Sequence, residues 1–67
     1  MKGTIKRLVS EKKFGFIGPE DGSKDIFFHA SGLQEGLMFD ELQVGDVLMF
    51  DVEQSEKGPR AMNVARA

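Results

Sequence analysis

Glycines, prolines and charged clusters divide this chain at intervals too short for any helix longer than a turn. Typical turn signals stand at Gly18-Pro19, Asp21-Gly22 and Gly58-Pro59. The β-compatible runs between such breaks span residues 4–9, 14–18, 25–29, 46–53 and 61–65. Five short strands separated by turn signals predict an all-β sandwich or barrel. We expect one further element, a single 3₁₀ turn over residues 31–34 with Ser31 as its N-cap.

With 67 residues, the chain is expected to form one domain, residues 1–67, around a thin core. Such a core leaves little room for a deep catalytic cavity. The chain has no cysteine, so disulfides and thiolate metal sites are excluded, which fits a reducing cytoplasm. The longest apolar run, residues 47–50, is far too short for a membrane span, and the basic residues 1–13 do not resemble a secretory leader. We therefore expect a cytoplasmic protein without metal or cofactor.

Strand alternation assigns side chains to the inside or the outside of the predicted barrel, because successive residues point to opposite faces. The most economical core consists of Ile5, Ile17, Ile26, Phe28, Leu48, Phe50, Val52 and Val64. Four side chains on neighbouring strands then face outward, and we call them the aromatic face: Phe14, Phe16, Phe27 and His29. By itself, Phe14-Gly15-Phe16 fits a core strand better than a binding surface. The run 26–29 favours the outward assignment, because one side of that strand must leave the core.

An exposed cluster of aromatic side chains usually marks a binding site. Nucleobases are suitable ligands, since stacking on an aromatic ring contributes roughly 1–3 kcal/mol per base and tolerates any sequence. The net charge of −2 argues weakly against nucleic acid, but four cations fall within residues 6–13 and seven acids within 35–56. The cations expected to contact phosphates around the aromatic face are Lys6, Arg7, Lys12, Lys13 and Arg60. Lys12 and Lys13 fit a solvated turn equally well.

The sequence KKFGFI at residues 12–17 resembles the first ribonucleoprotein motif of bacterial cold-shock proteins, Lys-Gly-Phe-Gly-Phe-Ile, and IFFH at 26–29 resembles the second, Val-Phe-Val-His. The tail GPRAMNV at 58–64 fits the same family pattern, so the resemblance covers nearly the whole chain. It implies a five-stranded antiparallel OB-type β-barrel that binds single-stranded RNA and DNA. The family's ligand contacts correspond to Lys6, Phe14, Phe16, Asp25, Phe27, His29, Phe39 and Arg60.

Three departures from the family pattern affect the predicted site. Arg7-Leu8-Val9 replaces Trp-Phe-Asn, Ala30 replaces a common Phe, and Lys13 replaces a turn glycine. Arg7 substitutes in part for Trp, since a guanidinium plane both stacks on bases and attracts phosphate. We therefore predict a narrower aromatic face and a steeper salt dependence of binding than in a Trp-bearing relative. If the backbone at residue 13 needs a positive φ, Lys13 is strained there or the turn is remodelled.

The predicted site residues suggest three candidate functions. The first is a monomeric RNA chaperone or cold-shock-type regulator of transcription and translation, which traps unpaired bases and needs no small-molecule substrate. The second is a protein-interaction module that uses the same apolar patch. The third is a small nuclease built on His29 and Asp25, but one histidine without a second base or a metal cluster is too little for a catalytic site. We expect no enzymatic activity, and the choice between RNA and DNA stays open.

Overall fold

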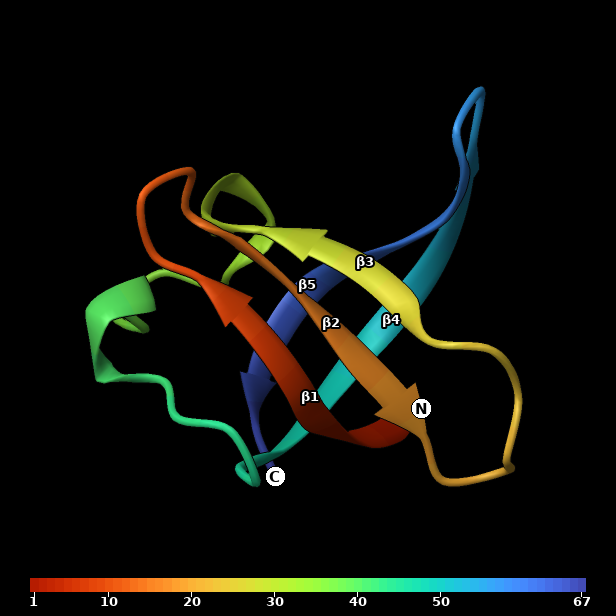
Figure 1. Cartoon of the computed structure of the whole chain (residues 1–67), viewed down its shortest axis with the longest axis horizontal. Coiled ribbons are helices and arrows are strands. Elements are labelled where there is room, and N and C mark those ends of the chain that lie inside the picture. Colours follow the sequence, from red (N-terminus) through yellow and green to blue (C-terminus); the bar gives the residue numbers. More distant parts are fainter.

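The computed structural model describes all 67 residues as one closed barrel of five strands. The strands are β1 (Lys2–Val9), β2 (Phe14–Pro19), β3 (Ile26–His29), β4 (Val47–Ser55) and β5 (Gly58–Arg66). They follow one another around the barrel in the order β1-β2-β3-β5-β4 (Figure 1). The predicted all-β, OB-type barrel is therefore confirmed, and each predicted run corresponds to one strand. No helix in the chain is long and apolar enough to cross a membrane.

The barrel departs from a purely antiparallel sheet at one seam. β3 and β5 run parallel, and the register joins them only at Phe27 and Arg60. The four other strand pairings are antiparallel. The parallel seam is a consequence of closing five strands into a ring, because four successive antiparallel pairings leave β5 running in the same direction as β3. This seam lies beside the aromatic face.

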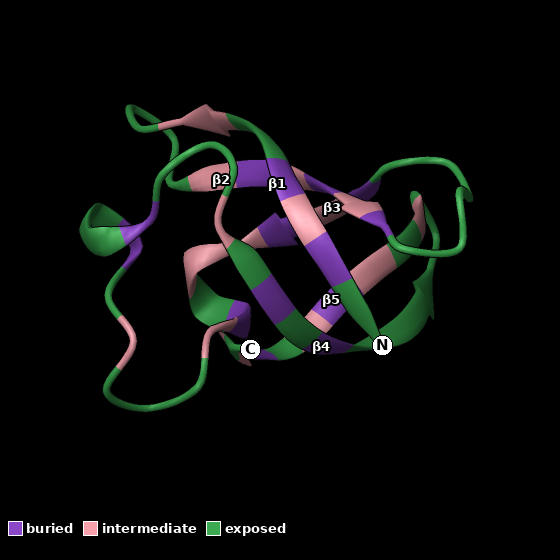
Figure 2. Ribbon diagram, turned by 90° about the horizontal axis from the view of Figure 1, so that it is seen from below, coloured by how far each residue is buried: buried purple, intermediate pink, exposed green.

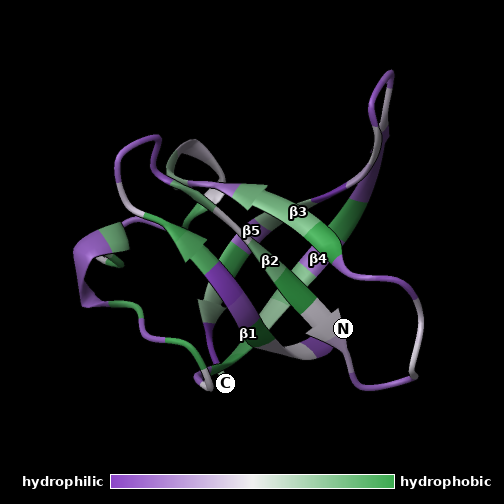
Figure 3. Ribbon diagram, viewed as in Figure 1, coloured by the Kyte–Doolittle hydropathy of each residue, from purple (hydrophilic) through white to green (hydrophobic).

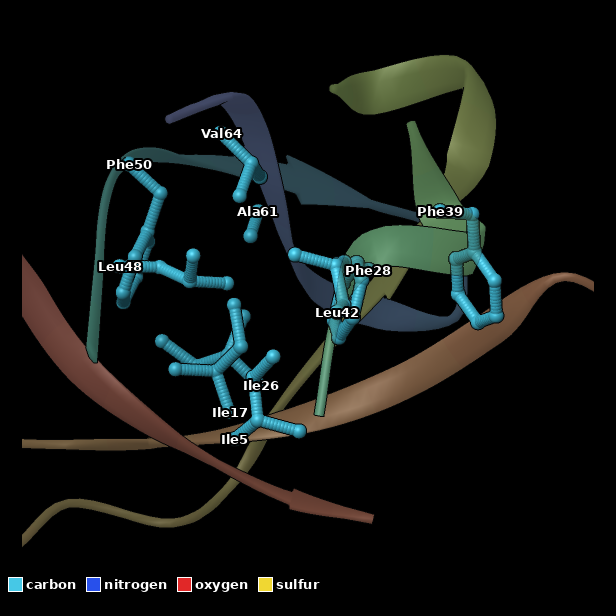
Figure 4. Close-up of a cluster of buried hydrophobic side chains, with 10 residues drawn as sticks. All are labelled: Ile5, Ile17, Ile26, Phe28, Phe39, Leu42, Leu48, Phe50, Ala61 and Val64. Carbon is cyan, nitrogen blue, oxygen red and sulfur yellow. The ribbon is translucent and has the colours of Figure 1, made fainter. Parts of the chain in front are cut away.

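Ten buried hydrophobic side chains form the core, drawn from all five strands and from the connection between β3 and β4 (Figure 4). They are Ile5, Ile17, Ile26, Phe28, Phe39, Leu42, Leu48, Phe50, Ala61 and Val64. Seven of the eight residues predicted to point inward are among them. Buried and half-buried positions alternate strictly along β2 and β3 (Figure 2), as period-two alternation requires.

Val52 was expected in the core, and this expectation is wrong. Its side chain is 38% exposed, whereas Leu48 and Phe50 on the same strand are buried. Past Phe50, β4 and β5 leave the body of the barrel as a two-stranded ribbon that projects beyond it (Figure 1). β1 pairs with β4 only through residues 47–49, so no strand lies on that side of Val52, and its side chain points inward without being covered.

Gly15 lies where three segments meet too closely for a side chain. A Cβ at this position would stand 2.5 Å from the Arg7 carbonyl oxygen and 2.8 Å from the Phe28 ring. The glycine therefore allows β2 to approach β1 and lets the Phe28 ring fill the centre of the barrel. The phenylalanines on either side of it are free to point outward.

The connection between β3 and β4 carries two 3₁₀ turns, η1 (Ala30–Gly32) and η2 (Phe39–Glu41). The turn expected over residues 31–34 thus begins one residue earlier, and its N-cap is His29 rather than Ser31. The imidazole replaces the serine hydroxyl as the cap because its Nδ1 accepts the Ser31 backbone N–H. The sequence analysis did not predict η2.

Two β-bulges, one in β1 and one in the β4–β5 pairing, shift the inward and outward alternation of the side chains. In β1 the register passes from Ile5–Ile17 to Arg7–Phe16, which leaves Lys6 without a partner. In β5, Asn63 has a φ of 53° beside a register shift against β4, and its Nδ2 donates to Asp51 Oδ2 at 3.1 Å. Asn is one of the few residues that tolerate this left-handed conformation. Bulges of this kind re-aim the side chains that follow them.

Candidate nucleic-acid interface

A single row of side chains crosses four strands on the outside of the barrel. Arg7 of β1 lies opposite Phe16 of β2, Phe16 opposite Phe27 of β3, and Phe27 opposite Arg60 of β5. Directly opposed residues share one face of a sheet, with neighbouring strands about 4.8 Å apart. The two phenylalanines are therefore flanked by a guanidinium on each side. We call this arrangement the Arg–Phe–Phe–Arg row.

A second row lies beside the first, two residues further along the strands. Val9 lies opposite Phe14, and Phe14 opposite His29. All four members of the aromatic face are half-buried, as the outward assignment predicts. β3 is coloured hydrophobic over most of its length although only alternate residues are buried (Figure 3). The apolar surface left over is the aromatic face.

The three phenylalanine rings support one another rather than lying in one plane. Their centroids are 5.4–6.0 Å apart. The rings of Phe14 and Phe27 are inclined by only 38°, whereas Phe16 stands at 88° to Phe14 and 69° to Phe27. These are favourable aromatic geometries, and they hold the rings in fixed orientations. Phe14 and Phe27 are thus the pair closest to coplanar, and Phe16 is steeply inclined to both.

The Ser31 contact fixes the hydrogen-bonding character of His29. The Ser31 backbone N–H donates to Nδ1 at 3.1 Å, and the Ser31 hydroxyl oxygen lies 3.1 Å from the same atom. Because a backbone N–H only donates, Nδ1 carries a lone pair, and the neutral imidazole has its proton on Nε2. His29 thus offers a ligand one N–H donor and the face of its ring.

Lys13 has the positive φ that the family pattern suggested, at 58°. Its ammonium donates to Asp40 Oδ1 at 2.9 Å and lies 5.9 Å from the centre of the Phe39 ring. The contact ties the turn after β1 to η2. Lys13 is therefore paired within the protein, whereas Lys12, Arg7 and Arg60 form no ion pair.

Phe39 was expected, by resemblance, among the ligand contacts, but the structure does not bring it to the aromatic face. Its ring is only 6% exposed, and its centroid lies 6.1 Å from that of Phe28. The connection between β3 and β4 folds over an open end of the barrel, and Phe39 and Leu42 close it. The aromatic face therefore gains no further ring from this connection.

Lys6 and Asp25 lie together at the end of β2, away from the β1–β2 turn. Both side chains lie over Gly18, where a Cβ would stand 2.6 Å from the Lys6 Cε and 3.4 Å from an Asp25 carboxylate oxygen. Asp25 immediately precedes β3, and His29 ends it, so about 13 Å of strand separates their backbones. A nuclease pair of His29 and Asp25 has no geometric basis here.

An open groove of about 770 Å³ adjoins the aromatic face on the side of the β3–β5 seam, and we call it the hairpin groove. Its lining residues are Phe16, Phe27, His29, Ser31, Ser55, Glu56, Lys57, Pro59 and Arg60. Five of these were not predicted, and four of the five lie in or beside the β4–β5 turn, which only the tertiary fold brings to the aromatic face. The Arg60 Nε is buried there without a hydrogen-bond partner.

Comparison with known proteins gives a consistent result over the whole chain. A family model described as the 'Cold-shock' DNA-binding domain matches residues 1–67. The cold shock-like protein CspB of Yersinia pestis is 47% identical over 64 residues, which cover 96% of this chain and 90% of the relative. The cold shock-like protein CspC of Escherichia coli K12 is 45% identical over 64 residues, with 96% and 91% covered.

Proposed function

The chain belongs to the cold-shock DNA-binding domain family, and on that basis we propose that it binds single-stranded RNA and DNA through the aromatic face. The observation that carries the proposal is the Arg–Phe–Phe–Arg row. Its phenylalanine rings can stack on the flat bases of a single strand, and its guanidinium groups can pair with the charged phosphates. Neither contact depends on base identity, so the row favours broad rather than strict sequence recognition.

Binding would trap bases in an unpaired state. A base stacked on Phe27 or Phe16 is withdrawn from pairing, at a gain of roughly 1–3 kcal/mol per base. Arg7 and Arg60 would hold the backbone at the two ends of the row, and Lys12 would add charge near the β1–β2 turn. The protein would thus keep hairpins open without a nucleotide cofactor, as an RNA chaperone or a regulator of transcription and translation. This mechanism requires no catalytic step.

Oligo-dT binding by the variants Phe16→Ala and Phe27→Ala tests the proposal. Each should bind a seven-nucleotide dT oligomer on the order of 10-fold more weakly than the wild-type protein. Val47→Ala is the matched control, because Val47 is an exposed apolar strand residue outside both rows. Circular dichroism checks that all three variants keep the fold.

Unchanged affinity in both phenylalanine variants would overturn the proposal. That result would favour the second candidate, a protein-interaction module on the same apolar patch. Chemical-shift mapping with the oligomer distinguishes the two functions further. Nucleic-acid binding predicts that the largest shifts fall on β2, β3 and the β4–β5 turn.

A further inference from the structure

The Arg–Phe–Phe–Arg row ends in two arginines that lie in different surroundings. Arg7, on β1, is exposed, whereas Arg60, on β5, is half-buried. The Nε of Arg60 is covered by protein and has no hydrogen-bond partner. Its two terminal nitrogens are not covered in this way, and the residue lines the hairpin groove. Packing therefore holds the stem of the Arg60 side chain, and the end of its guanidinium is open to a ligand.

No carboxylate of the protein pairs with the Arg60 guanidinium. Glu53 lies directly opposite Arg60 on β4, and Glu56 lines the same groove, yet neither forms an ion pair with it. Arg66, by contrast, pairs with Asp46. A buried N–H donor without an acceptor costs free energy, so the fold gains no stability from the polar end of Arg60. The unused charge and donors are therefore available for an anionic group of a ligand.

We propose that Arg60 is a phosphate clamp, whose two terminal nitrogens donate to the two free oxygens of one phosphate. The inference rests on the proposed function, since this phosphate belongs to the strand that stacks on the aromatic face. The planar fork of a guanidinium matches two oxygens of a phosphate. Because Arg60 lies directly opposite Phe27, the clamp holds the phosphate beside the base that stacks on this ring. Arg60 is thus a positioning residue, whereas the exposed Arg7 contributes mainly charge.

Replacement by lysine separates the fork from the charge, because an ammonium is a point charge without a fixed fork. In Arg60→Lys, affinity for a seven-nucleotide dT oligomer should fall by about fivefold, while the slope of log affinity against log salt stays unchanged. In Arg60→Gln the slope should also become shallower by about 0.7, because one phosphate contact is lost. A residue with a purely structural role would not separate affinity from salt slope in this way.

Arg66→Lys is the matched control, since it makes the same chemical change outside both the row and the groove. It should leave the affinity unchanged, and Arg7→Lys should lose less affinity than Arg60→Lys. A seven-nucleotide dA oligomer then identifies the oxygen atoms that Arg60 contacts, because adenine has no carbonyl group. A phosphate clamp requires the same loss in Arg60→Lys on dA as on dT. Circular dichroism checks that the variants keep the fold.

Three results would overturn the inference. A loss in Arg60→Lys on dT alone would show that Arg60 contacts a base carbonyl. Unchanged affinity in Arg60→Lys would show that charge is sufficient at this position. An equally large loss in Arg7→Lys would show that the two ends of the row are equivalent. Failure of the wild-type protein to bind either oligomer would instead contradict the proposed function.

Discussion

Arg7 lies directly opposite Phe16, although Ile5, two residues earlier on the same strand, lies opposite Ile17 inside the barrel. Strict alternation would place Ile5 and Arg7 on one face. The bulge at Lys6 adds one residue to β1 and reverses the parity, so that a guanidinium reaches the outer surface beside an aromatic ring. We expect the cation at this point, where the family pattern has Trp, to make binding more dependent on charge.

The salt dependence of binding should therefore respond to Arg7. In Arg7→Trp, the slope of log affinity against log salt should become shallower by about 0.7, the value for one phosphate contact on a single strand. A fluorescence titration with a dT oligomer at three salt concentrations measures the slope. Lys2→Ala, at an exposed lysine on the β4 side of β1, should leave it unchanged. Equal slopes for wild type and Arg7→Trp would contradict a phosphate contact at Arg7.

The Asp40 carboxylate lies 2.9 Å from the Lys13 ammonium, so in the proposed function it would compete with a ligand phosphate for Lys13. In Asp40→Asn the lysine becomes free, and affinity for the dT oligomer should rise by about two- to threefold, with a steeper salt slope. The same titration measures both quantities. The variant Glu35→Gln, which removes an unpaired negative charge, provides the comparison. A uniform gain in both variants would show that only net charge matters.

Lys13 has a φ of 58°, which glycine adopts without strain and an L-residue does not. Lys13→Gly and Lys13→Ala both lose the contact with Asp40. The difference in stability between the two variants therefore measures the backbone strain alone. The glycine variant should be more stable than the alanine variant by about 1 kcal/mol, or about 4–8 °C in Tm. Thermal unfolding followed by circular dichroism measures this. Equal melting temperatures would indicate that the turn relaxes to a negative φ.

Hydrogen bonds from the Ser23 hydroxyl and from the Ser23 backbone N–H hold the pKa of Asp21 below its ordinary value. A lowered pKa in the folded state means that this carboxylate supports the fold above its ordinary pKa, and that the support is lost as the pH falls through the lowered one. In Ser23→Ala the pKa should rise toward the ordinary value, because the larger of the two causes is removed. An NMR titration of the Asp21 carboxyl carbon checks this shift.

The strand positions and the aromatic face follow from sequence-local rules. Turn residues set the strand ends, and the period of two places Phe14, Phe16, Phe27 and His29 outside. The same rules fail at Val52, because alternation gives a direction but not a covering layer. They give no direction to Phe39, which was expected at the site only by resemblance and whose burial depends on a connection that folds over the barrel end. In both cases the deciding contacts join segments that are distant in the sequence.

The sequence by itself therefore determined the five strands, most of the core and the rings that face outward, since each depends on neighbouring residues and a fixed side-chain period. The tertiary structure alone decided three features of the site. A bulge brings Arg7 beside Phe16, Asp40 binds Lys13 across 27 positions, and the β4–β5 turn carries Glu56 to the edge of the aromatic face. These features depend on an added residue in β1 and on packing between distant segments. The local side-chain period of a strand predicts neither.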